Sequence, residues 1–379
     1  MRSILTLCLA TLGALSGVQP LSAQSPFNSN SLCFDGIDDF VTVPYDASFP
    51  VDIFTVAAWV KCTAPTEPWA VIVSRGDDDS SDNAPWELRV RSDGTFQLAI
   101  EDRNEVTDIY ASNTVIADGS WHHVAATRDL LGLVRLYVDG ASVAGFGSSL
   151  IPSPLNTQDL SIGCTIGSST SPPHSFLQGG IDEVAMWSRA KSASQIQSIY
   201  QGGPTASTIA LRGYWRFDSI LGQDVEDSSL DLNHGYLGND PLLADPADPS
   251  VLPSVQAVET IRPGFPPNPN AYLPGQTSGP VIGNKWDPVI DHTSFVPNSI
   301  LDVFGISLSA VNIPDPVIGT VLCGPTIYRR FRAPGKAFNL NIPNDCIFVG
   351  VSLCTSAGSF DPAGNLSLTN AIDITIGSY

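Results

Sequence analysis

The chain has 379 residues, of which 38 are acidic and 18 are basic, so its formal net charge at pH 7 is −20. An acidic surface repels phosphate, which argues against a nucleic-acid-binding protein. Aspartate outnumbers glutamate by 31 to 7, and 32 glycines and 30 prolines accompany it. Because Asp, Gly and Pro are typical of turns whereas Glu and Lys are typical of solvated helices, this composition predicts strands and loops rather than long helices.

The N-terminus is typical of a secretory signal peptide. Arg2 precedes an apolar stretch over residues 4–18, and small residues follow at Ser22 and Ala23. We expect cleavage after Ala23, so that residues 1–23 are removed and the protein is secreted or held at the cell-envelope surface. No second apolar stretch is long enough to cross a membrane, so no transmembrane span is expected in the mature chain.

Cysteines give a second indication of an oxidising compartment. Six of them follow the predicted signal peptide: Cys33, Cys62, Cys164, Cys323, Cys346 and Cys354. An even number in an exported chain favours disulfides, but the sequence leaves the connectivity open. Three cysteines lie in each half of the chain, so either one pair joins the two halves or two thiols stay free. None has the close spacing of a zinc site.

Alternation of apolar and polar residues runs through most of the chain and predicts strands. Clear examples are residues 54–61, 86–91 and 95–100. The Asp-Gly pair at residues 93–94 lies between two such runs and predicts a hairpin turn. One short helix is expected at residues 192–200, which end before a Gly-Gly-Pro sequence.

The composition also predicts where domains begin and end. Residues 241–274 are rich in Pro, Asp, Ser and Asn and are predicted to be a linker. A first β-domain is expected over residues 24–240 and a second over residues 275–379.

Six segments of the first domain occur in a characteristic order: residues 34–44, 54–60, 121–125, 136–140, 160–163 and 180–187. They include the sequences Phe-Asp-Gly-Ile-Asp-Asp-Phe, Trp-His-His-Val-Ala and Gly-Ile-Asp-Glu-Val. This series resembles the laminin-G-like and pentraxin-like branch of the concanavalin A-like lectin/glucanase superfamily. The resemblance implies an all-β jelly-roll sandwich of two curved antiparallel sheets, with ligands bound on or beside the concave face.

The first group of candidate calcium ligands lies in the loop before Trp86. It consists of carboxylate and amide side chains, which supply the oxygen ligands that calcium requires: Asp77, Asp79, Asp82 and Asn83. Asp82-Asn83 resembles a pair that contributes to calcium binding in pentraxins. The loop at residues 163–174, where a pentraxin would supply further carboxylates, contains no acidic residue.

A second group contains Asp35, Asp38 and Asp39, which Asp182 or Glu183 would join if the terminal strands are neighbours. Calcium is therefore a candidate cofactor at either place. The alternative, that these aspartates form turns and are solvated, stays open.

Aromatic side chains are candidates for carbohydrate binding, because sugar rings stack on exposed Trp and Tyr faces. Trp69 and Trp86 flank the acidic loop, and Tyr110 is a third candidate for a groove. Four other tryptophans occupy positions that are core positions in the family: Trp59, Trp121, Trp187 and Trp215.

Catalytic motifs were not found. Glu101 and Glu105 do not have the spacing of the catalytic carboxylates in the glucanases of this fold. His122 and His123 point to opposite faces of a strand, so they cannot chelate one ion together. We therefore predict a protein that is not an enzyme.

The second domain is expected to be a smaller β-sandwich. The sequences at residues 339–345 and 368–377 resemble a C-terminal β-domain of secreted proteins from Planctomycetes-type bacteria, a resemblance that implies no activity. The basic run at Arg329, Arg330 and Arg332 is either a solvated face or a contact for an acidic surface.

The leading hypothesis is a secreted, non-catalytic binding or adhesion protein that recognises carbohydrate or another cell-surface ligand, with or without calcium. A structural envelope component that recognises extracellular protein is the alternative, and a polysaccharide-active enzyme is a third possibility.

Overall fold

The computed structural model describes residues 30–76, 84–102, 104, 106–152, 157–166, 171–205, 208–264 and 268–379. The predicted signal peptide lies outside these residues. So does the first group of candidate calcium ligands: Asp77, Asp79, Asp82 and Asn83.

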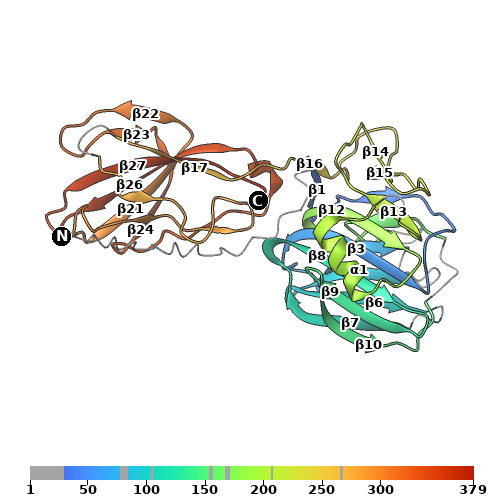
Figure 1. The fold of residues 1–379 in the computed structure, drawn as a ribbon. Coiled ribbons are helices and arrows are strands. Elements are labelled where there is room, and N and C mark those ends of the chain that lie inside the picture. The colour runs from blue at the N-terminus through green and yellow to red at the C-terminus, as the bar shows by residue number, and fades with distance from the viewer. Residues whose placement is uncertain are drawn as a thin grey trace, which may run out of the picture.

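The described chain forms two β-rich units placed end to end (Figure 1). Strands and loops make up nearly all of both units, as the composition predicts, and the all-β fold class is confirmed. The described residues include one α-helix, α1 (Ala193–Gly202), and one short 3-10 helix, η1 (Cys346–Phe348). No helix among the described residues has the length and apolar character that a membrane span needs.

The first unit is a sandwich of two antiparallel sheets of eight strands each. Sheet A has the order β10 (Ala141–Gly147), β9 (Leu133–Val138), β8 (Asp118–Arg128), β3 (Phe54–Thr63), β12 (Gln178–Trp187), β1 (Ser31–Asp35) and β16 (Ser250–Leu252), with β13 (Leu211–Trp215) beside β12. Sheet B has the order β14 (Asp224–Val225), β15 (Gly235–Leu237), β2 (Val41–Val43), β11 (Leu160–Ile162), β4 (Trp69–Arg75), β5 (Trp86–Arg91), β6 (Thr95–Glu101) and β7 (Thr107–Val115).

The core of the first unit lies between these two sheets. Alternate residues of each strand point inward, such as Val56 and Val60 on β3 and Leu88 and Val90 on β5, all of which are fully buried. The period-two pattern in the sequence thus becomes one continuous apolar layer.

The outer face of sheet A is covered in two places. Helix α1 begins with a capping box formed by Ser192 and Gln195, and its buried Ile196 packs on Ala57 and Trp187. The second unit covers Trp59 and Trp121 on the same sheet with Ile282 and other apolar side chains. Helix α1 and the second unit therefore cover part of this face, and sheet B lies on the opposite side of the sandwich.

The second unit is built on a five-stranded sheet with the order β17 (Val258–Arg262), β27 (Leu366–Thr375), β26 (Ser352–Phe360), β21 (Leu301–Ser307) and β24 (Thr326–Arg332). Three two-stranded sheets complete it: β18 (Tyr272–Leu273) with β20 (Val289–Ile290), β19 (Lys285–Trp286) with β25 (Leu340–Asn341), and β22 (Ala310–Ile313) with β23 (Val321–Cys323). Phe304 packs with Tyr272, Trp286 and Phe338 at the centre of its core.

The stretch predicted as a linker, residues 241–274, differs from that expectation because strands run through it. β16 pairs with β1 in sheet A, and β17 pairs with β27 in the second unit, so the chain passes from one unit to the other between residues 252 and 258. Both strands lie at sheet edges, where Pro and polar residues are tolerated. This explains why the composition resembled a linker.

Polar and covalent contacts join the two units. Cys33 of β1 is disulfide-bonded to Cys346, and the Lys61 ammonium donates a hydrogen bond to the carbonyl oxygen of Ser378 at 3.0 Å. A second disulfide, Cys323–Cys354, lies within the second unit. Cys62 and Cys164 are free and buried. Both outcomes that the cysteine distribution left open therefore occur together.

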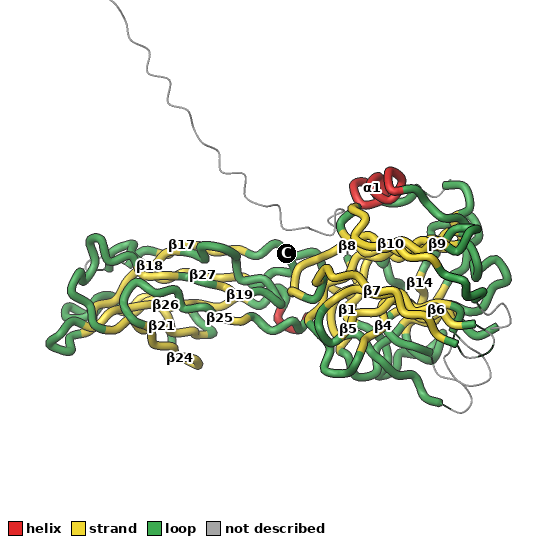
Figure 2. Tube along the Cα trace, turned by 90° about the horizontal axis from the view of Figure 1, so that it is seen from below, coloured by secondary structure: helices red, strands yellow, loops and turns green. Residues whose placement is uncertain are grey.

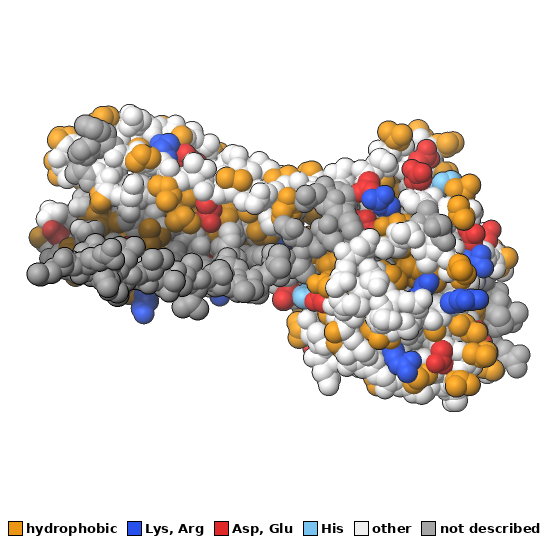
Figure 3. Space-filling model, in the orientation of Figure 1, with side chains coloured by type: hydrophobic (Ala, Val, Ile, Leu, Met, Phe, Trp, Pro, Cys, Tyr) orange, Lys and Arg blue, Asp and Glu red, His pale blue; other side chains and the backbone are white. Residues whose placement is uncertain are grey.

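Charge is distributed unequally between the units. Residues 256–379 contain eight acidic and six basic residues, so nearly all of the net negative charge belongs to the preceding part of the chain. Figure 3 shows this asymmetry on one face, where most of the visible charged side chains lie on the first unit.

Candidate functional site

The outer face of sheet B carries a buried polar network. On β5, Leu88 and Val90 point into the core, so Glu87 and Arg89 point outward. One carboxylate oxygen of Glu87, Oε1, accepts hydrogen bonds from the hydroxyls of Ser74 at 2.9 Å and Thr165 at 2.8 Å. The other, Oε2, accepts from Nε of Arg89 at 2.6 Å. The network holds both charged side chains in fixed positions, because every bond lies out of contact with water.

Trp69 lies at the margin of this network, at the start of β4. Its side chain is half-buried, and the guanidinium carbon of Arg89 lies 4.6 Å from the centre of its ring. This cation–π contact fixes the orientation of the indole. The indole N–H has no hydrogen-bond partner among the described residues. The indole nitrogen is itself buried, so the site consists of a half-buried aromatic ring held by an immobilised ion pair.

The other two predicted ligand-binding aromatics lie in the core. Trp86 is 0% exposed, stacks on Phe54 with ring centres 5.4 Å apart, and donates its indole N–H to the carbonyl oxygen of Pro50. Tyr110 is 5% exposed and donates its hydroxyl to Asp108 at 2.8 Å. Neither ring has a face free for a ligand, which corrects the expectation that they form a groove.

Strand alternation is the signal that distinguishes these residues. Trp86 is two residues before Leu88, so it shares the buried side of β5. Glu87 and Arg89 occupy the alternate positions, yet they were not among the predicted site residues. The strand pattern was present in the sequence, but only the pairing with β4 shows that Trp69 lies beside Arg89.

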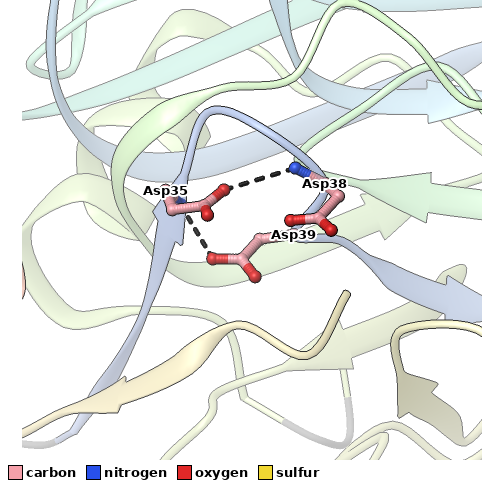
Figure 4. A group of neighbouring side chains, drawn as sticks. All are labelled: Asp35, Asp38 and Asp39. Atoms are coloured by element: carbon pink, nitrogen blue, oxygen red, sulfur yellow. Dashed lines mark hydrogen bonds between the residues drawn. The ribbon is translucent and has the colours of Figure 1, made fainter. Parts of the chain in front are cut away.

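Asp35, Asp38 and Asp39 come together in the turn between β1 and β2 (Figure 4). One oxygen from each lies within 4.8 Å of the others. The backbone N–H of Asp35 donates to Oδ2 of Asp39 at 2.8 Å, and Oδ1 of Asp35 accepts from the backbone N–H groups of Ile37 and Asp38 at 2.7 and 3.3 Å. Burial raises the pKa of Asp39 to about 7, and the charges of Asp35 and Asp38 add to this effect.

Asp182 does not join this turn, although the sequence suggested that it would. β1 and β12 are neighbours, as expected, but their register places Asp35 opposite Gln178. Asp182 is four residues farther along β12, a distance of about 13 Å in a strand. It is 0% exposed and lies opposite Trp59 of β3.

A small cavity of about 120 Å³ adjoins the aspartate turn. Asp35 and Gly36 form one wall, and residues 63–67 and Ala70 lie on another. Because Ala70 follows Trp69 directly, the cavity places the aspartate turn and Trp69 at the same end of the sandwich. Its volume is below the 300 Å³ or so of a usual ligand pocket, so it suits an ion with its waters rather than a sugar ring.

Comparison with protein families identifies the first unit. Residues 35–197 match the family described as the concanavalin A-like lectin/glucanases superfamily. The first unit is a concanavalin A-like domain. The resemblance of the six sequence segments is thereby confirmed.

Two curated proteins are similar over the same part of the chain. Pappalysin-1 of Mus musculus is 29% identical over 183 residues, and pappalysin-1 of Homo sapiens is 28% identical over 183 residues. Each match covers 45% of this chain but only 11% of pappalysin-1, so the chain spans about a tenth of the length of these relatives.

Two solved structures are similar to part of this chain. A putative carbohydrate-binding protein from Bacteroides ovatus has a TM-score of 0.45 and 18% identity, over 56% of this chain and 58% of that one. A heptameric pentraxin from Limulus polyphemus has a TM-score of 0.39 and 16% identity, over 54% of this chain and 97% of that one.

Proposed function

We propose that this chain is a secreted, non-catalytic protein that binds carbohydrate at Trp69, on the outer face of sheet B. The observation that carries the proposal is the fixed arrangement of Trp69, Arg89 and Glu87. A sugar ring has apolar C–H faces, and these faces can stack on an aromatic ring whose orientation is already fixed by a buried ion pair beside it. The lectin/glucanase family of the domain supports the same ligand class.

We further propose that calcium assists this site through the turn of Asp35, Asp38 and Asp39. Backbone N–H groups use only Oδ1 of Asp35 and Oδ2 of Asp39, so the other carboxylate oxygens are left for a cation. Three neighbouring carboxylates repel one another, and a divalent ion would relieve that repulsion. Calcium would hold the end of β1 in place beside the small cavity at this end of the sandwich.

Export is part of the proposal. The predicted signal peptide and the two disulfides both suit an oxidising compartment outside the cytoplasm. Edman sequencing or mass spectrometry of the mature N-terminus would test cleavage after Ala23.

A glycan array probed with the mature protein, in calcium and in chelator, tests the binding function. We expect a defined set of glycans to be retained and Trp69→Ala to abolish retention, because the variant removes the stacking surface. Tyr328→Ala is the matched control, since Tyr328 is an exposed aromatic residue of the second unit, and it should bind as the wild type does.

Three results would each overturn a part of the proposal. Binding that survives Trp69→Ala would place the site elsewhere, and an array without signal in either condition would remove carbohydrate as the ligand. Release of shortened sugars from a bound polysaccharide would show that the protein is an enzyme.

A further inference from the structure

β24 is the last strand of the five-stranded sheet, and one of its edges is unpaired. It pairs with β21 along one side, and no described strand pairs with its other side. In Figure 2 it lies at the margin of the second unit. Its backbone N–H and C=O groups on that side are available to an added strand.

A groove runs over the outer face of the sheet beside β24. Its volume is about 310 Å³, and Gly305 of β21 is one of the residues that line it. The walls are mainly apolar and include Val303, Ile318, Leu322, Phe331, Leu366 and Leu368. Phe331 is 52% exposed, so this apolar surface is open to solvent.

The arginines of β24 divide between its two faces. Arg330 and Arg332 donate to the carbonyl oxygens of Asn339 and Phe338, at 2.7 and 3.4 Å. Arg329 points to the other face, lines the groove with Phe331, and has no hydrogen-bond or ion-pair partner among the described residues. No acidic residue is found among the described residues that line the groove. The groove therefore presents one unsatisfied positive charge between apolar side chains.

We propose that β24 and this groove form a docking site for an extended segment of a partner protein, which adds to the sheet as a sixth strand. The segment would carry one carboxylate between two apolar side chains on the same face. Its backbone would hydrogen-bond to the free edge of β24, its carboxylate would pair with Arg329, and its apolar side chains would lie beside Ile327 and Phe331. This inference is independent of the carbohydrate-binding function of the first unit.

Charge complementarity favours an acidic partner over a second copy of the same edge. If two copies of β24 paired antiparallel about their centres, Arg329 would face Arg329 of the other copy, and like charges directly opposite destabilise a sheet. The same residue that prevents self-association selects a strand with a carboxylate at the matching position.

Fluorescence anisotropy with the mature full-length protein tests the proposal. The probe is a fluorescein-labelled peptide, acetyl-Thr-Val-Thr-Glu-Thr-Val-Thr-amide, and the comparison peptide has Lys in place of Glu. We expect the Glu peptide to bind and the Lys peptide to bind at least about tenfold more weakly, a ratio that corresponds to about 1.4 kcal/mol. Arg329→Glu should invert this preference. Arg135→Glu is the matched charge control, because Arg135 is exposed on β9 of the first unit. This variant should leave the affinities for the Glu peptide and the Lys peptide unchanged.

Hydrogen exchange distinguishes strand addition from binding by side chains alone. The Glu peptide should slow amide exchange in residues 326–332, because these N–H groups become hydrogen-bonded. The proposal is overturned if neither peptide binds the folded protein, if Arg329→Glu leaves the preference unchanged, or if binding occurs without protection of β24. Displacement of the peptide by dodecanoate, with no protection of β24, would identify the groove as a site for small amphiphiles instead.

Discussion

Cys33 and Cys346 are 313 residues apart in the sequence and are joined by a disulfide where the two units meet. Cys33 lies on β1, inside sheet A, and Cys346 begins η1 of the second unit. Around the bond, Trp59 and Trp121 pack with Ile282. The second unit is therefore attached to the first by covalent, apolar and polar contacts, and not only by the chain between them.

The first prediction concerns this disulfide. Changing Cys33 and Cys346 together to Ser should lower the free energy of unfolding by about 2–4 kcal/mol, because the unfolded chain loses a long closed loop. Urea unfolding under non-reducing conditions measures the change. Replacing Cys323 and Cys354 is the comparison, since that pair closes a loop within the second unit. If the Cys33/Cys346 variant unfolds at the wild-type midpoint, the bond does not stabilise the protein.

The fold could be predicted from the sequence because its signals are local. Apolar–polar alternation and the Asp-Gly turn can be recognised from neighbouring residues alone. The structure accordingly contains the hairpin of β5 and β6 where the sequence predicts it. The Cys33–Cys346 pair could not be predicted, because it depends on where the second unit packs against sheet A. The same limit applies to the linker, whose strands β16 and β17 form only through pairing with distant partners.

The candidate site was predicted less completely, because it depends on register. Asp182 was expected beside Asp35 because their strands were expected to be neighbours. The strands are indeed neighbours, but their register places Asp182 four residues along β12 from the position opposite Asp35. The alternation along β5 would have been enough to show that Trp86 is buried. Arg89 could be identified as a partner of Trp69 only once β4 and β5 were aligned.

The second prediction concerns Glu183, which has a positive φ of 53° in the irregular part of β12. Burial raises its pKa to about 7, although the Tyr214 hydroxyl, which donates to it, and Arg216, 3.6 Å away, oppose the shift. The folded state then binds a proton more tightly than the unfolded state, so stability falls as the pH rises from 4.5 to 7. Glu183→Gln should remove this loss.

Urea unfolding of the wild type and Glu183→Gln at pH 4.5 and pH 8 measures the effect. We expect similar stability at pH 4.5 and a variant that is more stable at pH 8, by up to about 3 kcal/mol. Asp231→Asn is the control for the change from carboxylate to amide, because Asp231 pairs with Arg212 near the surface. A variant that loses stability between these pH values as steeply as the wild type would contradict the shifted pKa.

The third prediction uses the opposite environments of His122 and His123 on β8. Burial lowers the pKa of His122, but hydrogen bonds with Asp118 and Asp139 outweigh it and raise the pKa to about 9. Its stabilising contribution is therefore complete below pH 6.5 and is lost as the pH rises through 9. His122→Asn should destabilise the protein at pH 6 by up to about 3 kcal/mol and much less at pH 10.

His123 gives the reverse dependence and serves as the internal comparison. It is buried against Trp59, with ring centres 5.6 Å apart, and burial lowers its pKa to about 4. The folded protein favours the neutral imidazole of His123, so the free energy of unfolding decreases as the pH falls from 6.5 toward 4. His123→Phe should reduce this loss, whereas His122→Asn should not. Equal pH profiles for the two variants would show that the two rings share one environment.

The fourth prediction is the response to calcium at Asp35 and Asp38. An ion bound only by the folded state, at a hundredfold excess over its Kd, adds about 2.7 kcal/mol to the free energy of unfolding. Calcium should therefore raise the Tm of the wild type, and chelator should reverse the increase. Asp35→Asn with Asp38→Asn should abolish the response, because neutral amides weaken cation binding. Asp361→Asn, in an exposed turn of the second unit, should keep it. A wild-type Tm that is the same in calcium and in chelator would remove the ion from this site and leave Trp69 to bind its ligand alone.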